Sequence, residues 1–194
     1  MPFVLTVDQR GSRRSSDQVP AVLAALSGVP TVLRFERTAG DEVQGVLDDP
    51  AAVVEVVRRL VRGGGWSIGI GAGPVQTPLP RSTRAATGPA FLAARAAVEA
   101  AKRRPVRVAV RGAVTEAAED AQAVLTALAA LLDRRSDQAW EAVELVEEGR
   151  TQAQAAGELG VTRQAVGQRL AAGLWEVERD LRPTAARLLA RAAG

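Results

Sequence analysis

Residues 151–174 read TQAQAAGELGVTRQAVGQRLAAGL, and this stretch decides the fold of the C-terminal part of the chain. Ala156 is small enough to lie where two helices cross, and Gly160, four positions later, can adopt the positive φ of a tight turn. Thr151 and Thr162 are placed to cap two helices, which we expect at residues 152–159 and from 163 to about 173. Apolar residues at helical spacing would hold the pair against a third helix at 140–148: Leu159, Val161, Val166 and Leu170. The stretch therefore predicts a helix-turn-helix at 151–173.

The start of the second of these helices carries side chains suited to contacting DNA. The second helix of such a motif enters the major groove with its first residues, and Arg and Gln have the hydrogen-bonding geometry to read G and A. The run VGQRLAAGL after a capping Thr resembles the last helix of sigma-factor region-four and LuxR-type modules. An ordinary helical hairpin is the alternative. The candidate DNA-binding residues are Thr162, Arg163, Gln164, Gln168 and Arg169.

Charge sets a limit on how tightly this motif would bind. The chain has 25 Lys and Arg against 22 Asp and Glu, but residues 137–194 hold seven Arg against nine acidic residues. DNA binding usually needs a basic surface. We therefore expect one copy to bind double-stranded DNA weakly, and a homodimer to be the binding species.

Upstream of residue 136, apolar runs typical of strands alternate with helical patterns. Strands are expected at 3–7, 31–36, 42–47, 66–71 and 106–110, and helices at 17–26, from 50 onward, at 90–102 and at 116–132. The first six elements follow the β-α-β-β-α-β order of a ferredoxin-like sheet. We predict an α+β fold with two domains, a ferredoxin-like domain at 1–135 and an all-α DNA-binding domain at 136–194 that ends in a helix from about 183 to 193.

Three carboxylates are predicted to meet at one edge of this sheet. Asp8 ends the first strand, while Asp41 and Glu42 lie in the hairpin between the second and third. Adjacent central strands would bring these oxygen donors together, and such donors suit Mg²⁺. The alternative is that Asp8 caps a loop and Asp41 belongs to an ordinary Gly-Asp turn.

An anion site is predicted beside these carboxylates. The loop that leads into the first helix could cradle a phosphate with its backbone N–H groups and arginines, and a helix start with free N–H groups lies near another arginine. The alternative for Arg95 is an ordinary position on the solvated face of an Ala-rich helix. The candidate phosphate-binding residues are Arg10, Gly11, Ser12, Arg13 and Arg95.

Four ordered motifs between residues 3 and 104 resemble the bacterial SatD family: VDQRGSRR, RTAGDEVQGVL, IGIGAG and TGPAFLAARAAVEAAKR. The matching residues are Asp8, Gly11, Ser12, Arg13, Gly40, Asp41, Glu42, Gln44, Gly69, Gly71, Gly88, Pro89, Ala90, Phe91, Ala94 and Arg95. The carboxylates also resemble the palm-type catalytic domain of class III nucleotide and diguanylate cyclases. That resemblance implies a palm-like fold, a nucleotide-type ligand and Mg²⁺. The chain departs from the SatD pattern at Gln9 and Val43. It has one Lys and no Asn, whereas active class III cyclases often use a Lys and an Asn-x-x-x-Arg pair.

Composition excludes several chemistries. With no Cys and no His, the chain has no disulfide, no thiol nucleophile, no Ser-His triad and no Cys or His ligand for zinc. No apolar run reaches 18 residues, so we expect a cytoplasmic protein without a membrane partner. The function expected is a DNA-binding transcriptional regulator, not an enzyme, whose cyclase-like domain dimerises or senses a nucleotide-type ligand. The alternatives are a Mg²⁺-dependent nucleotidyl cyclase or nucleotidyltransferase that uses Asp8 and Asp41, and a purely structural dimerisation module.

Overall fold

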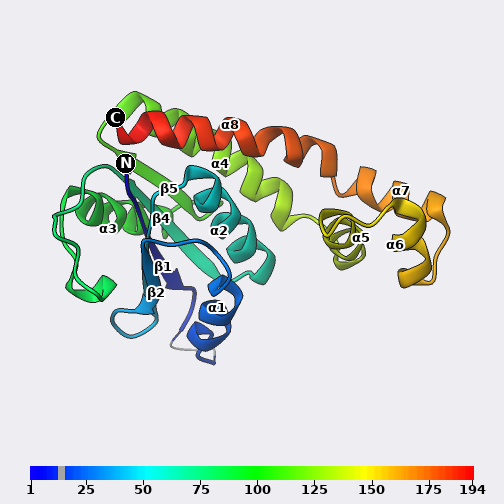
Figure 1. Cartoon of the computed structure of the whole chain (residues 1–194), viewed down its shortest axis with the longest axis horizontal. Helices are drawn as coiled ribbons and strands as arrows, with labels where there is room; N and C mark the ends of the chain where they lie inside the picture. Colours follow the sequence, from blue (N-terminus) through cyan, green and yellow to red (C-terminus); the bar gives the residue numbers. More distant parts are fainter. Residues whose placement is uncertain (13–15) are drawn as a thin grey trace.

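A five-stranded mixed sheet lies between helices in the computed structural model, which describes residues 1–12 and 16–194 (Figure 1). Within that range the strands are β1 (Phe3–Gln9), β2 (Leu33–Arg37), β3 (Glu42–Leu47), β4 (Trp66–Ala72) and β5 (Val108–Gly112). The helices are α1 (Val19–Leu26), α2 (Pro50–Gly63), α3 (Pro89–Ala101), α4 (Thr115–Asp133), α5 (Asp137–Glu147), α6 (Gln152–Leu159), α7 (Arg163–Ala172) and α8 (Trp175–Ala193), with a short 3₁₀ turn at Thr83–Ala85. The α+β class is confirmed, and most element ends lie within two residues of the sequence prediction.

The strands follow the order β2-β3-β1-β4-β5 across the sheet. β1 is antiparallel to both of its neighbours, β2 is antiparallel to β3, and β5 is parallel to β4. The register places Asp8 opposite Glu42, so the ends of these two strands meet as the sequence predicted.

Alternation along the strands gives the sheet two different faces. Phe3, Leu5 and Val7 of β1 pack into the main core with α1, α2, α4 and α8. Val4 points the other way, into a smaller core with the first turns of α3. The helices therefore cover both faces, with α3 alone among the described helices on the second face (Figure 1).

Two glycines of β4 let α3 approach the sheet unusually closely. A Cβ on Gly69 would lie 2.3 Å from the backbone nitrogen of Val98, and one on Gly71 would lie 2.0 Å from the carbonyl oxygen of Ala90. Ala94 contributes a small side chain at the same contact and is fully buried. The IGIG and GPAFLAAR motifs therefore serve helix-sheet packing, because no larger residue fits there.

The last helix returns to the first part of the chain. Ala185, Leu189, Ala192 and Ala193 lie in the same core as Phe3, and α8 runs antiparallel to α4, with Val114 N–H donating to the Ala192 carbonyl at 3.2 Å. The domain boundary at 135 stays a prediction, but part of the segment 136–194 completes the core of the segment before it (Figure 1).

The predicted start of this helix near Pro183 is wrong. The helix begins eight residues earlier, at Trp175, and Pro183 lies inside it with its ring exposed. A proline inside a helix costs about 3 kcal/mol. Glu178 before Pro183 and Leu189 after it are fully buried, and their packing keeps the helix continuous despite that cost.

A separate small core holds α5, α6 and α7 together beyond the edge of the sheet (Figure 1). Ala156 lies in it, and the αL conformation predicted for Gly160 is confirmed by a φ of 65° and a ψ of 32°. The caps are confirmed too, since Thr151 and Thr162 accept hydrogen bonds from the backbone N–H groups of Gln154 and Ala165. The buried apolar residues of this core are Ala142, Val143, Ala155, Ala156, Val166 and Leu170. None of the helices within 1–12 and 16–194 is long and apolar enough to span a bilayer.

Candidate functional site

The first turns of α7 present a polar surface opposite its buried side. Val166 and Leu170 face the small core, whereas Arg163, Gln164 and Gln168 are exposed. Thr162 is exposed too, and its hydroxyl oxygen accepts the Ala165 N–H at 3.1 Å, which fixes the start of the helix. Four of the five candidate DNA-binding residues are therefore exposed to solvent.

Arg169 differs from the other four. Its side chain is only 21% exposed, and its Nη1 lies 3.5 Å from Oε2 of Glu141 on α5. The guanidinium is thus directed toward the supporting helix, which gives Arg169 a structural role at the contact between α5 and α7.

The acidic residues of α5 are mostly paired with arginines of the neighbouring helices. Two of these arginines lie on α2: Arg62 Nε is 3.3 Å from Glu144 Oε1, and Arg58 Nη2 is 2.9 Å from Glu147 Oε2. Glu147 also pairs with Arg182 of α8. These carboxylates therefore face the body of the protein, which reduces the negative field that the sequence alone suggested around α7.

A cluster of charged and aromatic side chains joins the α5–α7 unit to the body, and we call it the junction: Arg58, Arg62, Arg135, Trp140, Glu147, Glu178 and Arg182. Arg135 donates to the Gly173 carbonyl oxygen from Nε at 2.9 Å and from Nη2 at 2.6 Å. Its guanidinium also lies 4.5 Å from the centre of the Trp140 ring, within cation–π range. The junction fixes both ends of the α5–α7 unit.

The carboxylate of Asp8 forms an ion pair with the side chain of Lys102. Nζ of Lys102, the only lysine, lies 2.7 Å from Asp8 Oδ2 and 2.8 Å from Glu99 Oε1. Burial would lower the pKa of Lys102, but the hydrogen bonds to Asp8 and Glu99 outweigh it and raise that pKa above its ordinary value. The sequence analysis did not predict this partner, because Lys102 lies 94 positions from Asp8.

The three candidate metal ligands do not gather around one point. Asp8 and Asp41 line a shallow hollow with Lys102 and Arg107, whereas Glu42 lines a neighbouring hollow and accepts a hydrogen bond from the Thr38 hydroxyl. Among residues 1–12 and 16–194, no group of three acidic residues could hold a metal ion. Because Asp8 is ion-paired and Glu42 is hydrogen-bonded, this donor set as it stands does not fit Mg²⁺.

The candidate phosphate-binding residues are divided between the same two hollows. Arg10, Gly11 and Ser12 lie beside Asp8 and Lys102, whereas Arg95 lies with Glu42 and Arg84. Arg13 lies outside the described residues.

Two backbone N–H groups at the start of α1 already donate hydrogen bonds to side chains of this chain. The Gln18 N–H donates to Gln9 Oε1 at 2.9 Å, and the Val19 N–H donates to Asp17 Oδ1 at 3.0 Å. The Gln9 side chain also donates to the Ser16 carbonyl at 2.7 Å and is buried. Gln9, which departs from the SatD pattern, therefore anchors the entry to α1 and leaves fewer N–H groups for a phosphate.

Comparison of the chain with family models, with curated proteins and with solved structures gives no match. The functional argument therefore depends on the geometry of the residues themselves.

Proposed function

We propose that the protein is a sequence-specific DNA-binding regulator in which α6 and α7 form a helix-turn-helix and α7 enters the major groove. The observation that carries the proposal is the exposed polar start of α7, set against its buried Val166 and Leu170 and reached through the αL turn at Gly160. Recognition helices of this motif contact base edges with their first residues. Arg163 and Gln164 occupy those positions.

The charges around α7 support the proposal. Arg163 forms no ion pair among the described residues, and α7 contains no acidic residue. Since Glu144 and Glu147 are paired with arginines of the body, the acids that remain near α7 are few. Arg163 is therefore available for a base or a phosphate.

We propose for residues 1–135 a ferredoxin-like, SatD-like domain that dimerises or binds a nucleotide-type anion, and a homodimer as the DNA-binding species. The strand order β2-β3-β1-β4 with α1 and α2 on one face supports this fold. The cations beside Asp8 support an anion-binding role over catalysis, because Lys102 already neutralises the carboxylate that a metal would need.

The test begins with selection of DNA sites from a random duplex pool by the full chain. Fluorescence anisotropy then compares the selected duplex with a scrambled one for the wild type, for Arg163→Ala/Gln164→Ala and for Arg191→Ala. Loss of two base-contacting side chains should weaken specific binding by about 1–3 kcal/mol for each good contact, or about 5-fold to 150-fold. Arg191 is an exposed residue at the far end of α8 and is the matched control, so its removal should leave the affinity within about twofold. An unchanged affinity of the double variant would overturn the assignment of α7.

A further inference from the structure

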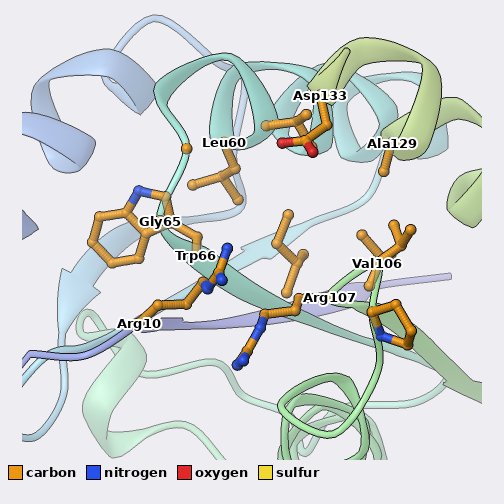
Figure 2. A pocket seen from close by; sticks show the side chains of 13 residues that line it. Arg10, Leu60, Gly65, Trp66, Val106, Arg107, Ala129 and Asp133 are labelled. Carbon is orange, nitrogen blue, oxygen red and sulfur yellow. The ribbon is translucent and has the colours of Figure 1, made fainter.

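A polar hollow lies on the second face of the sheet, between the β2–β3 hairpin, the 3₁₀ turn and the first turns of α3. We call it the Glu42 hollow, and its polar and charged lining includes Thr6, Thr38, Glu42, Gln44, Arg84 and Arg95. Its volume is about 420 Å³, within the range of sites that bind small molecules, about 300–1,000 Å³. By contrast, the pocket beside Trp66 holds only about 80 Å³, which is too small for such a ligand (Figure 2).

The Glu42 hollow contains charges of both signs that do not pair with each other. Arg84 Nη2 donates to the Thr38 carbonyl oxygen at 3.0 Å, and the Thr38 hydroxyl donates to Glu42 Oε1. Thr38 thus binds the guanidinium with one oxygen and the carboxylate with the other. Arg95 reaches the hollow from α3, and within residues 1–12 and 16–194 neither arginine nor Glu42 forms an ion pair. A ligand that carries both charges on neighbouring atoms would neutralise all three side chains.

Two uncharged polar side chains at the base of the hollow have hydrogen-bonding groups to spare. Thr6 is 1% exposed, and its hydroxyl oxygen accepts a hydrogen bond from Gln44 Nε2 at 2.8 Å. In the part of the chain that the structure describes, the Thr6 hydroxyl proton and the Gln44 amide oxygen have no further partner. Buried polar groups are usually hydrogen-bonded, so this donor and this acceptor favour a polar molecule in the hollow.

An exposed apolar side chain lies at the rim of the hollow. Leu92, in the first turn of α3, is 73% exposed, more than any other large apolar residue that the structure describes. It lines the hollow together with Phe91, which is nearly buried. Removing apolar surface from water is favourable, so Leu92 offers a surface to an apolar substituent of the ligand.

From these features we propose that the Glu42 hollow binds a free α-amino acid with an apolar side chain. The ammonium group donates to Glu42 and to the Gln44 amide oxygen. The carboxylate accepts from Arg84 and Arg95, and the side chain covers Leu92. A lone metal ion would lie beside two arginines, and a phosphate would lie beside a carboxylate, so the mixed charges favour a zwitterion over either ion. The proposal depends neither on DNA binding nor on the anion site beside Asp8.

Isothermal titration calorimetry of the full chain with L-leucine tests the proposal, together with three molecules that each lack one part of leucine. Isocaproate lacks the ammonium group, isoamylamine lacks the carboxylate, and glycine lacks the side chain. We expect saturable binding of leucine, and binding of isocaproate and isoamylamine about tenfold weaker or worse, because each has lost a charge-assisted contact. Glycine should bind severalfold more weakly than leucine, because it buries no surface of Leu92.

Three variants of the hollow assign the parts of the ligand to their partners. Glu42→Gln should lower the affinity for leucine about tenfold without weakening that for isocaproate, because only leucine carries the ammonium group. Arg95→Gln should weaken leucine severalfold without weakening isoamylamine, and Leu92→Ala should weaken leucine but not glycine. Glu119→Gln and Arg103→Gln remove the same charges from exposed positions outside the hollow and should leave the leucine affinity within about twofold.

Thermal melts of every variant separate loss of the site from loss of the fold. Absence of saturable leucine binding to the wild type would overturn the proposal. Equal binding of leucine and isocaproate would also overturn it, because the hollow would then be a simple anion site. A folded Glu42→Gln variant with unchanged leucine affinity would place the amino acid elsewhere on the protein and contradict the assignment.

Discussion

Nη1 of Arg135 lies 2.6 Å from Oε2 of Glu178, and both side chains are fully buried. The two residues are 43 positions apart, one after α4 and the other in the first turn of α8. Removing two charges from water is costly, and the cost is recovered only where geometry and further hydrogen bonds are good. Here Arg135 also donates from Nε and Nη2 to the Gly173 carbonyl oxygen, and Arg182 pairs with the carboxylate of Glu178.

Glu178→Gln should destabilise the protein strongly, because it leaves the Arg135 charge buried without its counter-ion. Breaking a buried pair on one side costs about 3–5 kcal/mol. The free energy of unfolding from urea titrations measures the effect. Glu158→Gln, which breaks the exposed Arg150–Glu158 pair, is the matched control and should cost at most about 1 kcal/mol. Equal losses for the two variants would contradict a special role for the buried pair.

Gly71→Ala should be among the most destabilising small substitutions in the chain. The added methyl would lie 2.0 Å from the Ala90 carbonyl oxygen and 2.5 Å from the Ala94 nitrogen, so α3 must move away from the sheet. We expect a loss of about 1–3 kcal/mol or more, as for an overpacked core. Thermal unfolding gives the magnitude, and a variant as stable as the wild type would show that α3 does not lie so close.

Gly160→Ala and Gly157→Ala should have effects of opposite sign. Gly160 has a φ of +65°, and the left-handed conformation costs another residue about 1–2 kcal/mol. Gly157 lies inside α6 with nothing within 4 Å of an added Cβ, so alanine should stabilise the helix by up to about 1 kcal/mol. Chemical denaturation of both variants checks the sign, and a Gly160→Ala variant as stable as Gly157→Ala would contradict the αL turn.

The contribution of Glu55 to stability should depend on pH. Burial would raise the pKa of Glu55, but hydrogen bonds from Arg58 and Arg59 outweigh it and hold the pKa below its ordinary value of 4.5. A lowered folded-state pKa stabilises the protein above the unfolded value, and that stabilisation is lost as the pH falls through the folded value. The difference in unfolding free energy between the wild type and Glu55→Gln should thus be largest above about pH 5 and shrink as the pH falls below 4.5.

Glu119→Gln is the control for that series. Glu119 is exposed on α4 and forms no ion pair among the described residues, so its substitution should change neither the stability nor its pH dependence appreciably. If the difference in unfolding free energy between the wild type and Glu55→Gln stays constant down to pH 3, the ion pairs with Arg58 and Arg59 do not contribute to stability.

Local features were predictable from the sequence because their physics is local. The caps at Thr151 and Thr162 and the turn at Gly160 depend on neighbouring residues only, and all three are confirmed. The pairing of Asp8 with Glu42 on adjacent strands followed from strand order and is confirmed by the register, although the two carboxylates line different hollows.

Features that depend on distant partners were not predictable in the same way. Lys102 reaches Asp8 across 94 positions, and nothing near Asp8 in the sequence indicates it. The early part of α8 was missed because Pro183 breaks helices locally, and only packing far from it in sequence keeps this helix continuous. The pocket beside Trp66 needs four separate segments and escaped notice for the same reason.

The α5–α7 unit is attached to the body through two neighbouring helices, α4 and α8, and not through one linker (Figure 1). A DNA-binding unit joined by a single flexible linker can reorient and bind operators with different half-site spacings. Two connections to the body restrict that reorientation. In the proposed homodimer, the separation of the two α7 helices would then be set by the interface between the bodies. Such a dimer would tolerate little variation in the number of base pairs between half-sites, because each added pair also rotates one half-site around the duplex axis.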